Sequence, residues 1–277
     1  MRNDSSFIEL RARERARLLL DEGSYRELLD PFDGVMSPWL PMQGIVPQAD
    51  DGMIVAKGTI EGKPTVVIAI EGTFQGGSMG EVSGAKMAAA LELAAEDHRR
   101  GVPTQAVLCL ETGGVRLQEA NLGLAAIADI HAAIVDLRRS TPVVGVIAGT
   151  VGCFGGMSIA AGLCSTLIVT REARLGLNGP QVIEQEAGIE EYDSRDRPFI
   201  WRMTGGEARY RSGLADVLVN DGVHAVKEAV TQALMRGVPA QHRTDNYQDM
   251  LARLNKVDTT QQPETEQIQQ FFAGDAL

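Results

Sequence analysis

Two glycine-rich stretches decide the fold: LCLETGGVRLQEA (residues 108–120) and GVIAGTVGCFGGMSIAAGLCSTLIVT (residues 145–170). In each, an apolar, strand-like run ends at a Gly-Gly pair, and a helical pattern follows it. A related segment, FQGGSMGEVSGAKMAAALELA, precedes them at residues 74–94. Continuous apolar strands that alternate with helices are typical of a sheet covered on both faces. The pattern therefore predicts an α/β protein.

The same alternation predicts the other elements of the chain. Residues 53–60 and 64–72 are expected to form a β-hairpin, because a short turn with Gly62 joins two runs of strand-forming residues. We expect further strands at 105–111, 142–148 and 166–170, and helices at 79–98, 117–137, 156–163 and 223–235.

The segments on either side of this pattern have different compositions. Residues 5–30 have the leucine spacing of helices, with a break at Gly23. Residues 31–52 are rich in Pro, Gly and Met, which predicts an irregular loop that covers the site or contacts a partner. The chain accordingly divides into an N-terminal segment, a main α/β domain and a polar C-terminal tail, at residues 1–52, 53–240 and 241–277.

Composition argues against several classes of binding partner and against a membrane or secreted location. The 277 residues carry 26 Lys and Arg against 37 Asp and Glu, a formal net charge of −11, which disfavours nucleic acid and anionic lipid as partners. No stretch reaches the ~18 continuous apolar residues of a membrane span, and the N-terminus lacks the apolar core of a secretory signal. We therefore expect a cytoplasmic protein with three buried cysteines, Cys109, Cys153 and Cys164.

The glycine pairs are candidates for binding an anionic oxygen. A Gly-Gly pair that leads into a helix exposes backbone N–H groups beside the positive end of the helix dipole. Other motifs are lacking: no histidine pair has metal spacing, no serine lies in a nucleophile elbow, and neither a dinucleotide nor a Walker motif is present. Two interpretations stay open at this point: glycines that only permit tight packing, and an oxyanion hole that stabilises a thioester enolate.

These stretches, together with RARERARLLLDEGSYREL at residues 11–28 and TREARLGLNGPQVIEQEAG at residues 170–188, resemble the carboxyltransferase family of acyl-CoA carboxylases, in the crotonase-like superfamily. The resemblance covers residues 9–235 and is to the β-type, N-terminal half of the family. It implies a single domain built as a spiral of ββα units. The sequence has no four-cysteine zinc ribbon and no biotinyl Met-Lys-Met segment, as in members that decarboxylate a malonyl thioester without biotin.

The resemblance also implies roles for individual residues. In the family, backbone N–H groups of two glycine loops bind the oxygen of a thioester enolate. On this chain these oxyanion donors would be Gly114, Val115, Gly155 and Gly156. The implied substrate-binding positions are Gly76, Gly77, Gly113, Asn178, Gly179 and Pro180. Gln118 and Glu119 are expected to support the first loop, and Arg116 is expected to face solvent or a partner.

A function and an assembly follow from the same resemblance. It implies a chain that decarboxylates a malonyl group on acyl carrier protein, together with a homologous α-type carboxyltransferase subunit. The carrier would hold the malonyl group on a phosphoribosyl-dephospho-CoA arm, for which CoA is an analogue, and a transferase subunit would load it. No metal and no tightly bound cofactor is expected on this chain. Two alternatives stay open: the β subunit of a biotin-dependent acyl-CoA carboxyltransferase, and a non-catalytic scaffold subunit.

Overall fold

The computed structural model describes residues 5–258, 260 and 265–273. Its centre is a seven-stranded sheet with the order β1-β2-β3-β4-β5-β6-β7. The strands are β1 Arg26–Leu28, β2 Met53–Ile60, β3 Lys63–Ile70, β4 Gln105–Cys109, β5 Val143–Ile147, β6 Thr166–Thr170 and β7 Val217–Val219. Strands β1 to β3 pair in antiparallel fashion, and β3 to β7 are parallel. The expected hairpin and the three strands expected after it are confirmed.

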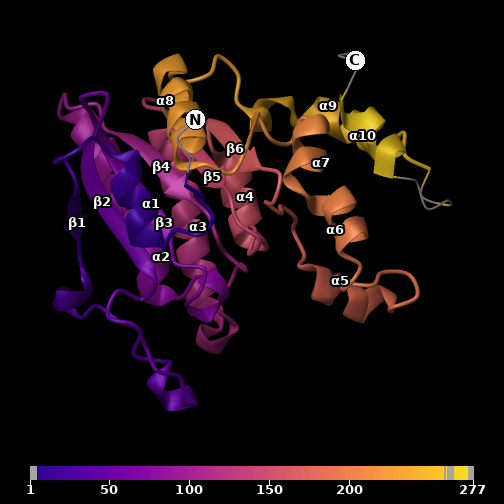
Figure 1. The fold of residues 1–277 in the computed structure, drawn as a ribbon, viewed down its shortest axis with the longest axis horizontal. Helices are drawn as coiled ribbons and strands as arrows, with labels where there is room; N and C mark the ends of the chain where they lie inside the picture. Colours follow the sequence, from indigo (N-terminus) through magenta and orange to yellow (C-terminus); the bar gives the residue numbers. More distant parts are fainter. Residues whose placement is uncertain (1–4, 259, 261–264, 274–277) are drawn as a thin grey trace.

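Helices cover both faces of this sheet (Figure 1). One face carries α2 (Glu81–Arg99), α3 (Asn121–Leu137) and α4 (Gly156–Leu163), and the opposite face carries α1 (Ala12–Leu19) and α8 (Val223–Arg236). Side chains alternate along β4, so that Leu108 packs into the first layer, whereas Val107 and Cys109 pack into the second. All three cysteines are buried, as expected.

Short segments beyond the main strands complete a repeating unit. Isolated parallel pairs join Met79 to Val115, Thr112 to Cys153, and Cys153 to Leu175. The paired segments at Met79, Thr112 and Cys153 each follow a main strand and precede a helix, so the unit is a strand, a short strand and a helix. The expected spiral of ββα units is therefore confirmed, and it brings the glycine-rich turns together at one edge of the sheet.

The N-terminal segment differs from expectation in its second half. Of the two expected helices only α1 forms, and residues 26–28 form β1, in which Leu28 pairs with Val55 of β2. Gly23 has a φ of +78°, which turns the chain back along β2. The expectation of a second helix was wrong because pairing with an open sheet edge outweighs the helical spacing of the leucines.

Residues 31–52 form the expected irregular loop, apart from two single-turn 3-10 helices at Pro31–Asp33 and Pro41–Gln43. Hydrogen bonds fasten the loop to the body, among them those of Trp39 and Ser37. The Trp39 indole N–H donates to Glu81 Oε2 at 2.6 Å, and the Ser37 hydroxyl donates to Glu119 Oε1 at 2.7 Å. The loop therefore has a fixed position beside the first turn of α2.

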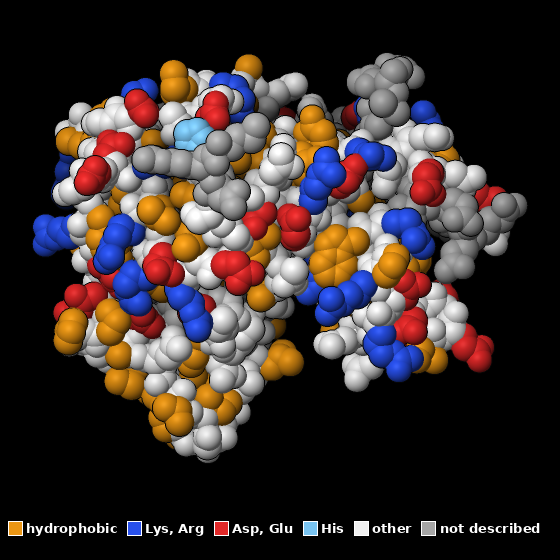
Figure 2. Space-filling view, in the orientation of Figure 1, with side chains coloured by type: hydrophobic (Ala, Val, Ile, Leu, Met, Phe, Trp, Pro, Cys, Tyr) orange, Lys and Arg blue, Asp and Glu red, His pale blue; other side chains and the backbone are white. Residues whose placement is uncertain are grey.

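A helical region follows β6 in the sequence and lies beside the sheet (Figure 1). This α5–α7 region consists of α5 (Pro180–Ala187), α6 (Arg197–Thr204) and α7 (Gly206–Arg211). In the space-filling view, a notch separates its lower part from the body that contains the sheet (Figure 2).

The C-terminal part, expected to be a polar tail from residue 241, contains two further helices, α9 (Tyr247–Leu254) and α10 (Thr265–Ala273). Residues 259, 261–264 and 274–277 of that tail lie outside the described residues. In the part of the chain that is described, no helix combines the length and the apolar character needed to cross a membrane.

Candidate active site

The first glycine loop, with Gly113 and Gly114, and the second glycine loop, with Gly155 and Gly156, are in backbone contact at the edge of the sheet. The Phe154 N–H donates to the Thr112 carbonyl at 3.0 Å, and the Thr112 N–H donates to the Gly152 carbonyl at 2.8 Å. A Cβ on Gly114 would lie 3.0 Å from the Phe154 carbonyl oxygen, and a Cβ on Gly155 would lie 3.3 Å from the Gly114 Cα. Gly114 and Gly155 also have positive φ, +104° and +60°. Both space and backbone conformation therefore favour glycine at these two positions.

Two of the four expected amide donors are occupied by contacts within the protein. The Gly114 N–H donates to the Thr112 hydroxyl oxygen at 3.1 Å. The Gly155 N–H donates to the Leu177 carbonyl at 2.7 Å, which joins the second glycine loop to the segment before α5. In this conformation neither amide is free to bind a substrate oxygen, and both instead hold the loops in shape.

The other two amide donors, at Val115 and Gly156, have no acceptor among the described residues. Gly156 opens α4, and the first N–H groups of a helix find no partner inside it and lie at the positive end of its dipole. The Gly156 carbonyl oxygen lies 2.8 Å from His131 Nε2 of α3, which holds the first turn of α4 in place. The geometry therefore favours Val115 and Gly156 as the oxyanion donors of this conformation.

Three further glycines and the Ser158 hydroxyl make contacts close to the two loops. The Gly113 N–H donates to the Gly76 carbonyl at 2.9 Å, and a Cβ on Gly77 would lie 1.9 Å from the Glu111 carbonyl oxygen. The Ser158 hydroxyl donates to the Gly155 carbonyl at 2.7 Å. Gly76, Gly77 and Gly113 thus shape the loops, and the Ser158 hydroxyl bonds back to the carbonyl three residues earlier in the first turn of α4.

Arg116, the residue after Val115, is buried, so the expectation that it faces solvent or a partner was wrong. Its guanidinium donates to both carboxylate oxygens of Asp51, at 2.7 and 2.9 Å, and to Glu119 Oε1 at 2.9 Å. Only 1% of its side chain is exposed. A second nitrogen donates to the Ser78 carbonyl at 3.0 Å. A buried cation is tolerated only with such partners, and together they fix the backbone beside the Val115 amide.

Glu119 supports the first loop, as expected. Besides Arg116, it accepts from the Ser37 hydroxyl at 2.7 Å and from the Glu81 N–H at 2.6 Å. Burial opposes ionisation of this carboxyl group, but the hydrogen bonds from Glu81, Ser37 and Arg116 outweigh burial and lower its pKa. The ionised Glu119 therefore joins the loop of residues 31–52, the first turn of α2 and the first glycine loop.

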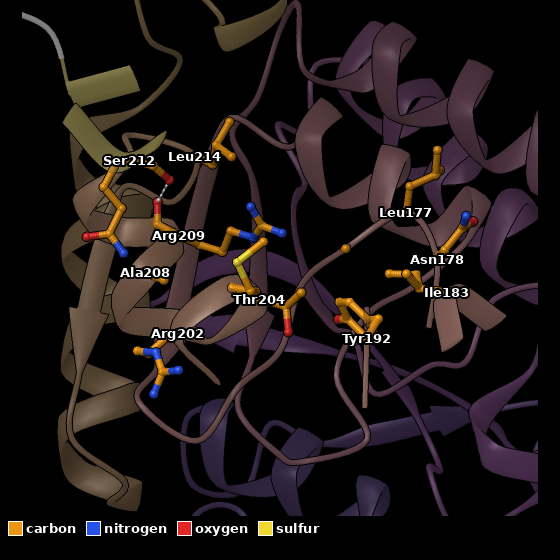
Figure 3. A pocket seen from close by; sticks show the side chains of 13 residues that line it. Leu177, Asn178, Ile183, Tyr192, Arg202, Thr204, Ala208, Arg209, Ser212 and Leu214 are labelled. Carbon is orange, nitrogen blue, oxygen red and sulfur yellow. Dashed lines mark hydrogen bonds between the residues drawn. The ribbon is translucent and has the colours of Figure 1, made fainter. Parts of the chain in front are cut away.

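A cavity of about 320 Å³ lies on the far side of the second glycine loop, between residues 176–178 and the helices α6 and α7 (Figure 3). Asn178 lines this cavity, but the other two residues expected beside it do not. Gly179 precedes α5 as its N-cap and Pro180 is its first residue. Because the Leu177 carbonyl accepts the Gly155 N–H, the wall of the cavity is attached directly to the second glycine loop.

Two polar residues of this cavity, Tyr192 and Arg209, were not expected from the sequence. Tyr192 lies in the acidic run 184–196, and Arg209 lies in a short helix with two charged neighbours, Glu207 and Arg211, within two residues. Neither position belongs to a motif, and only the packing of α5–α7 brings them to one cavity. Burial raises the pKa of Tyr192 and lowers the pKa of Arg209.

Within the described residues, no group of three or more His, Cys, Asp and Glu side chains could hold a metal ion. The glycine loops offer backbone N–H donors, those of Gly156 at the start of a helix. Such donors suit a carbonyl oxygen that gains negative charge.

Comparisons with known proteins agree with the fold. Residues 9–271 match the carboxyl transferase domain. The chain is 42% identical over 243 residues to the malonyl-S-ACP:biotin-protein carboxyltransferase MADC of Malonomonas rubra, and the match covers 84% of this chain and 76% of that protein.

Solved structures give the same result. A chain of a Pseudomonas malonate decarboxylase hetero-tetramer in complex with malonate is 67% identical, with a TM-score of 0.96 and 98% of each chain covered. A chain of a Pseudomonas MdcD-MdcE hetero-dimer is 60% identical, with a TM-score of 0.78, over 91% of this chain and 97% of that one. With its ββα spiral, its paired glycine loops and these matches along nearly its full length, the chain belongs to the carboxyl transferase domain family.

Proposed function

We propose that this chain is a catalytic subunit of a malonate decarboxylase, which releases CO2 from a malonyl thioester on acyl carrier protein. The observation that carries the proposal is that two backbone N–H groups, of Val115 and Gly156, have no acceptor among the described residues. They lie on two glycine loops that are in backbone contact. The 67% identity to a chain of the Pseudomonas malonate decarboxylase supports the same activity. The identity to the biotin-protein carboxyltransferase of Malonomonas rubra is lower, at 42%.

The chemistry requires only what the two loops offer. The bond between the malonyl carboxylate carbon and the methylene carbon breaks, and its electron pair moves into the thioester as an enolate. Negative charge collects on the thioester oxygen, where the Val115 and Gly156 N–H groups donate to it. Water then donates a proton to the methylene carbon, so that the products are acetyl thioester, CO2 and hydroxide. Each such donor is typically worth about 10² to 10³ in rate.

Partners complete the proposed enzyme. The two Pseudomonas relatives are parts of a hetero-dimer and a hetero-tetramer. By analogy, this chain pairs with a homologous α-type carboxyltransferase subunit, and the reacting group lies between the two. An acyl carrier protein presents the malonyl group on a phosphoribosyl-dephospho-CoA arm, and a transferase subunit loads it. No biotin takes part.

The test is CO2 release from malonyl-loaded carrier protein by this chain, by the α-type partner and by the two together, each measured with and without avidin. We expect CO2 only from the mixture, at a rate that avidin does not change. Full activity of the partner alone would make this chain a scaffold. Loss of activity on adding avidin would assign the chain to biotin-dependent carboxyl transfer instead.

A further inference from the structure

The cavity beside the second glycine loop has cationic side chains and no acidic ones. Arg202 and Arg209 line it, and none of the described residues that line it is Asp or Glu. The chain as a whole has the opposite balance, with 37 acidic and 26 basic residues. The remaining walls are largely apolar and include Leu177, Ile183 and Leu214. In the close-up, the Arg209 side chain reaches between these walls, whereas Arg202 lies at one end (Figure 3).

Arg209 is a partly buried cation, and no described residue gives it an acidic partner. Its Nε donates to the Leu175 carbonyl at 2.7 Å, and its other guanidinium N–H groups have no acceptor among the described residues. Burial lowers its pKa, and no carboxylate of the described residues counteracts this. Leaving a partly desolvated charge unpaired is costly, so the arrangement favours an anion that supplies the missing acceptors.

Tyr192 provides a second, independent sign of a ligand. It lines the same cavity, only 7% of it is exposed, and its hydroxyl has no hydrogen-bond partner among the described residues. Its ring packs edge-on against Phe199 with the centroids 5.1 Å apart, which holds the hydroxyl in place. Buried tyrosine hydroxyls normally find a partner. A hydroxyl O–H and a guanidinium in one apolar-walled cavity are a donor set for a small oxyanion.

The position of the cavity connects it to the glycine loops. The Leu177 carbonyl accepts the Gly155 N–H at 2.7 Å, and the Gly176 N–H donates to the Cys153 carbonyl at 3.3 Å. Residues 176 and 177, which form one wall of the cavity, are thus hydrogen-bonded to the segment that leads into α4. A ligand in the cavity therefore touches the same backbone that positions Gly156.

We propose that Arg209 and Tyr192 form a binding site for the carboxylate of a short-chain acid. Guanidinium N–H groups pair with the two oxygens of a carboxylate, and the tyrosine O–H donates a further hydrogen bond. The apolar walls and the volume of about 320 Å³ suit a short acyl chain. Resting on the proposed function, two sources have this chemistry: the malonyl group on the carrier arm, and free malonate.

The test compares the purified hetero-dimer of this chain and its α-type partner with its R209Q and Y192F variants. One arm measures the KM for malonyl-loaded carrier and the inhibition constant of acetyl-loaded carrier, which lacks the carboxylate. The other arm measures the Kd of sodium malonate by calorimetry, with sodium acetate and inorganic phosphate as comparison ions. R211Q is the matched control, because Arg211 also belongs to α7 but is exposed and pairs with Glu207.

We expect R209Q to weaken malonyl binding about 10- to 100-fold and Y192F to weaken it less, in at least one of the two arms. R211Q and the binding of acetyl-loaded carrier should be unchanged. An effect on the KM alone identifies the malonyl group as the ligand, and an effect on malonate alone identifies the free acid. Equal weakening for malonyl and acetyl carriers, no change in either arm, or a preference for phosphate would overturn the proposal. Because the calorimetric arm needs no turnover, it remains decisive even if the hetero-dimer releases no CO2.

Discussion

Two arginines, one buried and one partly buried, lie in opposite electrostatic surroundings. Arg116, beside the first glycine loop, has carboxylate oxygens of Asp51 and Glu119 within 2.9 Å. Arg209, in the α5–α7 region, has one backbone carbonyl as an acceptor and no carboxylate. The first cation is neutralised inside the protein, so it can serve only to hold structure. The second is not neutralised by any described residue, which leaves it available to an anionic ligand.

The surroundings of the two arginines differ in the same way. Around Arg116, hydrogen bonds from Ser37, the Glu81 N–H and the guanidinium converge on Glu119, so the region is internally satisfied. Around Arg209 there is a cavity, and the buried Tyr192 hydroxyl in it has no partner in the part of the chain that the structure describes. The polar groups of the glycine-loop region thus bind one another and hold the region rigid. Those of the α5–α7 cavity lack partners among the described residues, so they can bind a ligand.

The largest expected effect comes from removing the paired arginine. R116M leaves two buried carboxylates side by side without a cation, which should lower the free energy of unfolding by about 3–5 kcal/mol. Urea denaturation followed by circular dichroism measures the loss. R100M is the control, because Arg100 belongs to an exposed ion pair with Glu96 and its removal should have little effect. Similar unfolding curves for the two variants would refute the role given to Arg116.

A smaller effect on stability is expected at Glu111, whose carboxylate charge Arg15 neutralises only in part. Its Oε1 lies 3.6 Å from a nitrogen of Arg15, and burial raises its pKa despite that charge and the Gly149 N–H. The pKa of Glu111 is higher in the folded than in the unfolded state. The contribution of this carboxyl group to folding stability is therefore complete below the ordinary value of 4.5, and it is lost as the pH rises through the folded pKa.

E111Q tests this reasoning because it removes the titration and keeps an acceptor for the Gly149 N–H. Relative to the wild type, the urea midpoint of the variant should rise as the pH is raised from about 4.5 towards neutrality. A constant difference between the two proteins across that range would contradict the direction given to the pKa.

The smallest effect is expected from removing the unpaired arginine. R209M loses one hydrogen bond to the Leu175 carbonyl but also removes a partly buried charge that has no acidic partner among the described residues. The two changes oppose each other, so the free energy of unfolding should stay within about 1 kcal/mol of the wild type in the absence of ligand. Destabilisation as large as that of R116M would show that Arg209, too, is a structural residue, and the comparison would fail.

The sequence was sufficient for the features that depend on local pattern. Alternating apolar strands and helices predicted the sheet, and the Gly-Gly pairs before α3 and α4 predicted where the loops lie. A glycine pair can be recognised because positive φ and close backbone contact leave few other residues possible, as at Gly114 and Gly155.

Features that depend on distant partners could not be predicted in this way. Arg116 lies in a loop, and only the fold brings Asp51, which is 65 positions earlier, to its guanidinium. Residues 26–28 have a helical pattern, and an open sheet edge made them a strand. Likewise, nothing local distinguishes the free amide of Gly156 from that of Gly155, which a carbonyl in a later loop occupies.

The central claim, that free backbone amides on this chain stabilise the enolate, is tested most directly by comparing G156P with G156A in the hetero-dimer. Both substitutions add a Cβ, which would lie 2.8 Å from the Ile127 side chain, but only proline removes the N–H. Proline also fits the first position of a helix. With folding verified for both variants, we expect kcat for CO2 release by G156P to be about 10² to 10³ lower than that of G156A. Equal kcat values in the two folded variants would contradict the account.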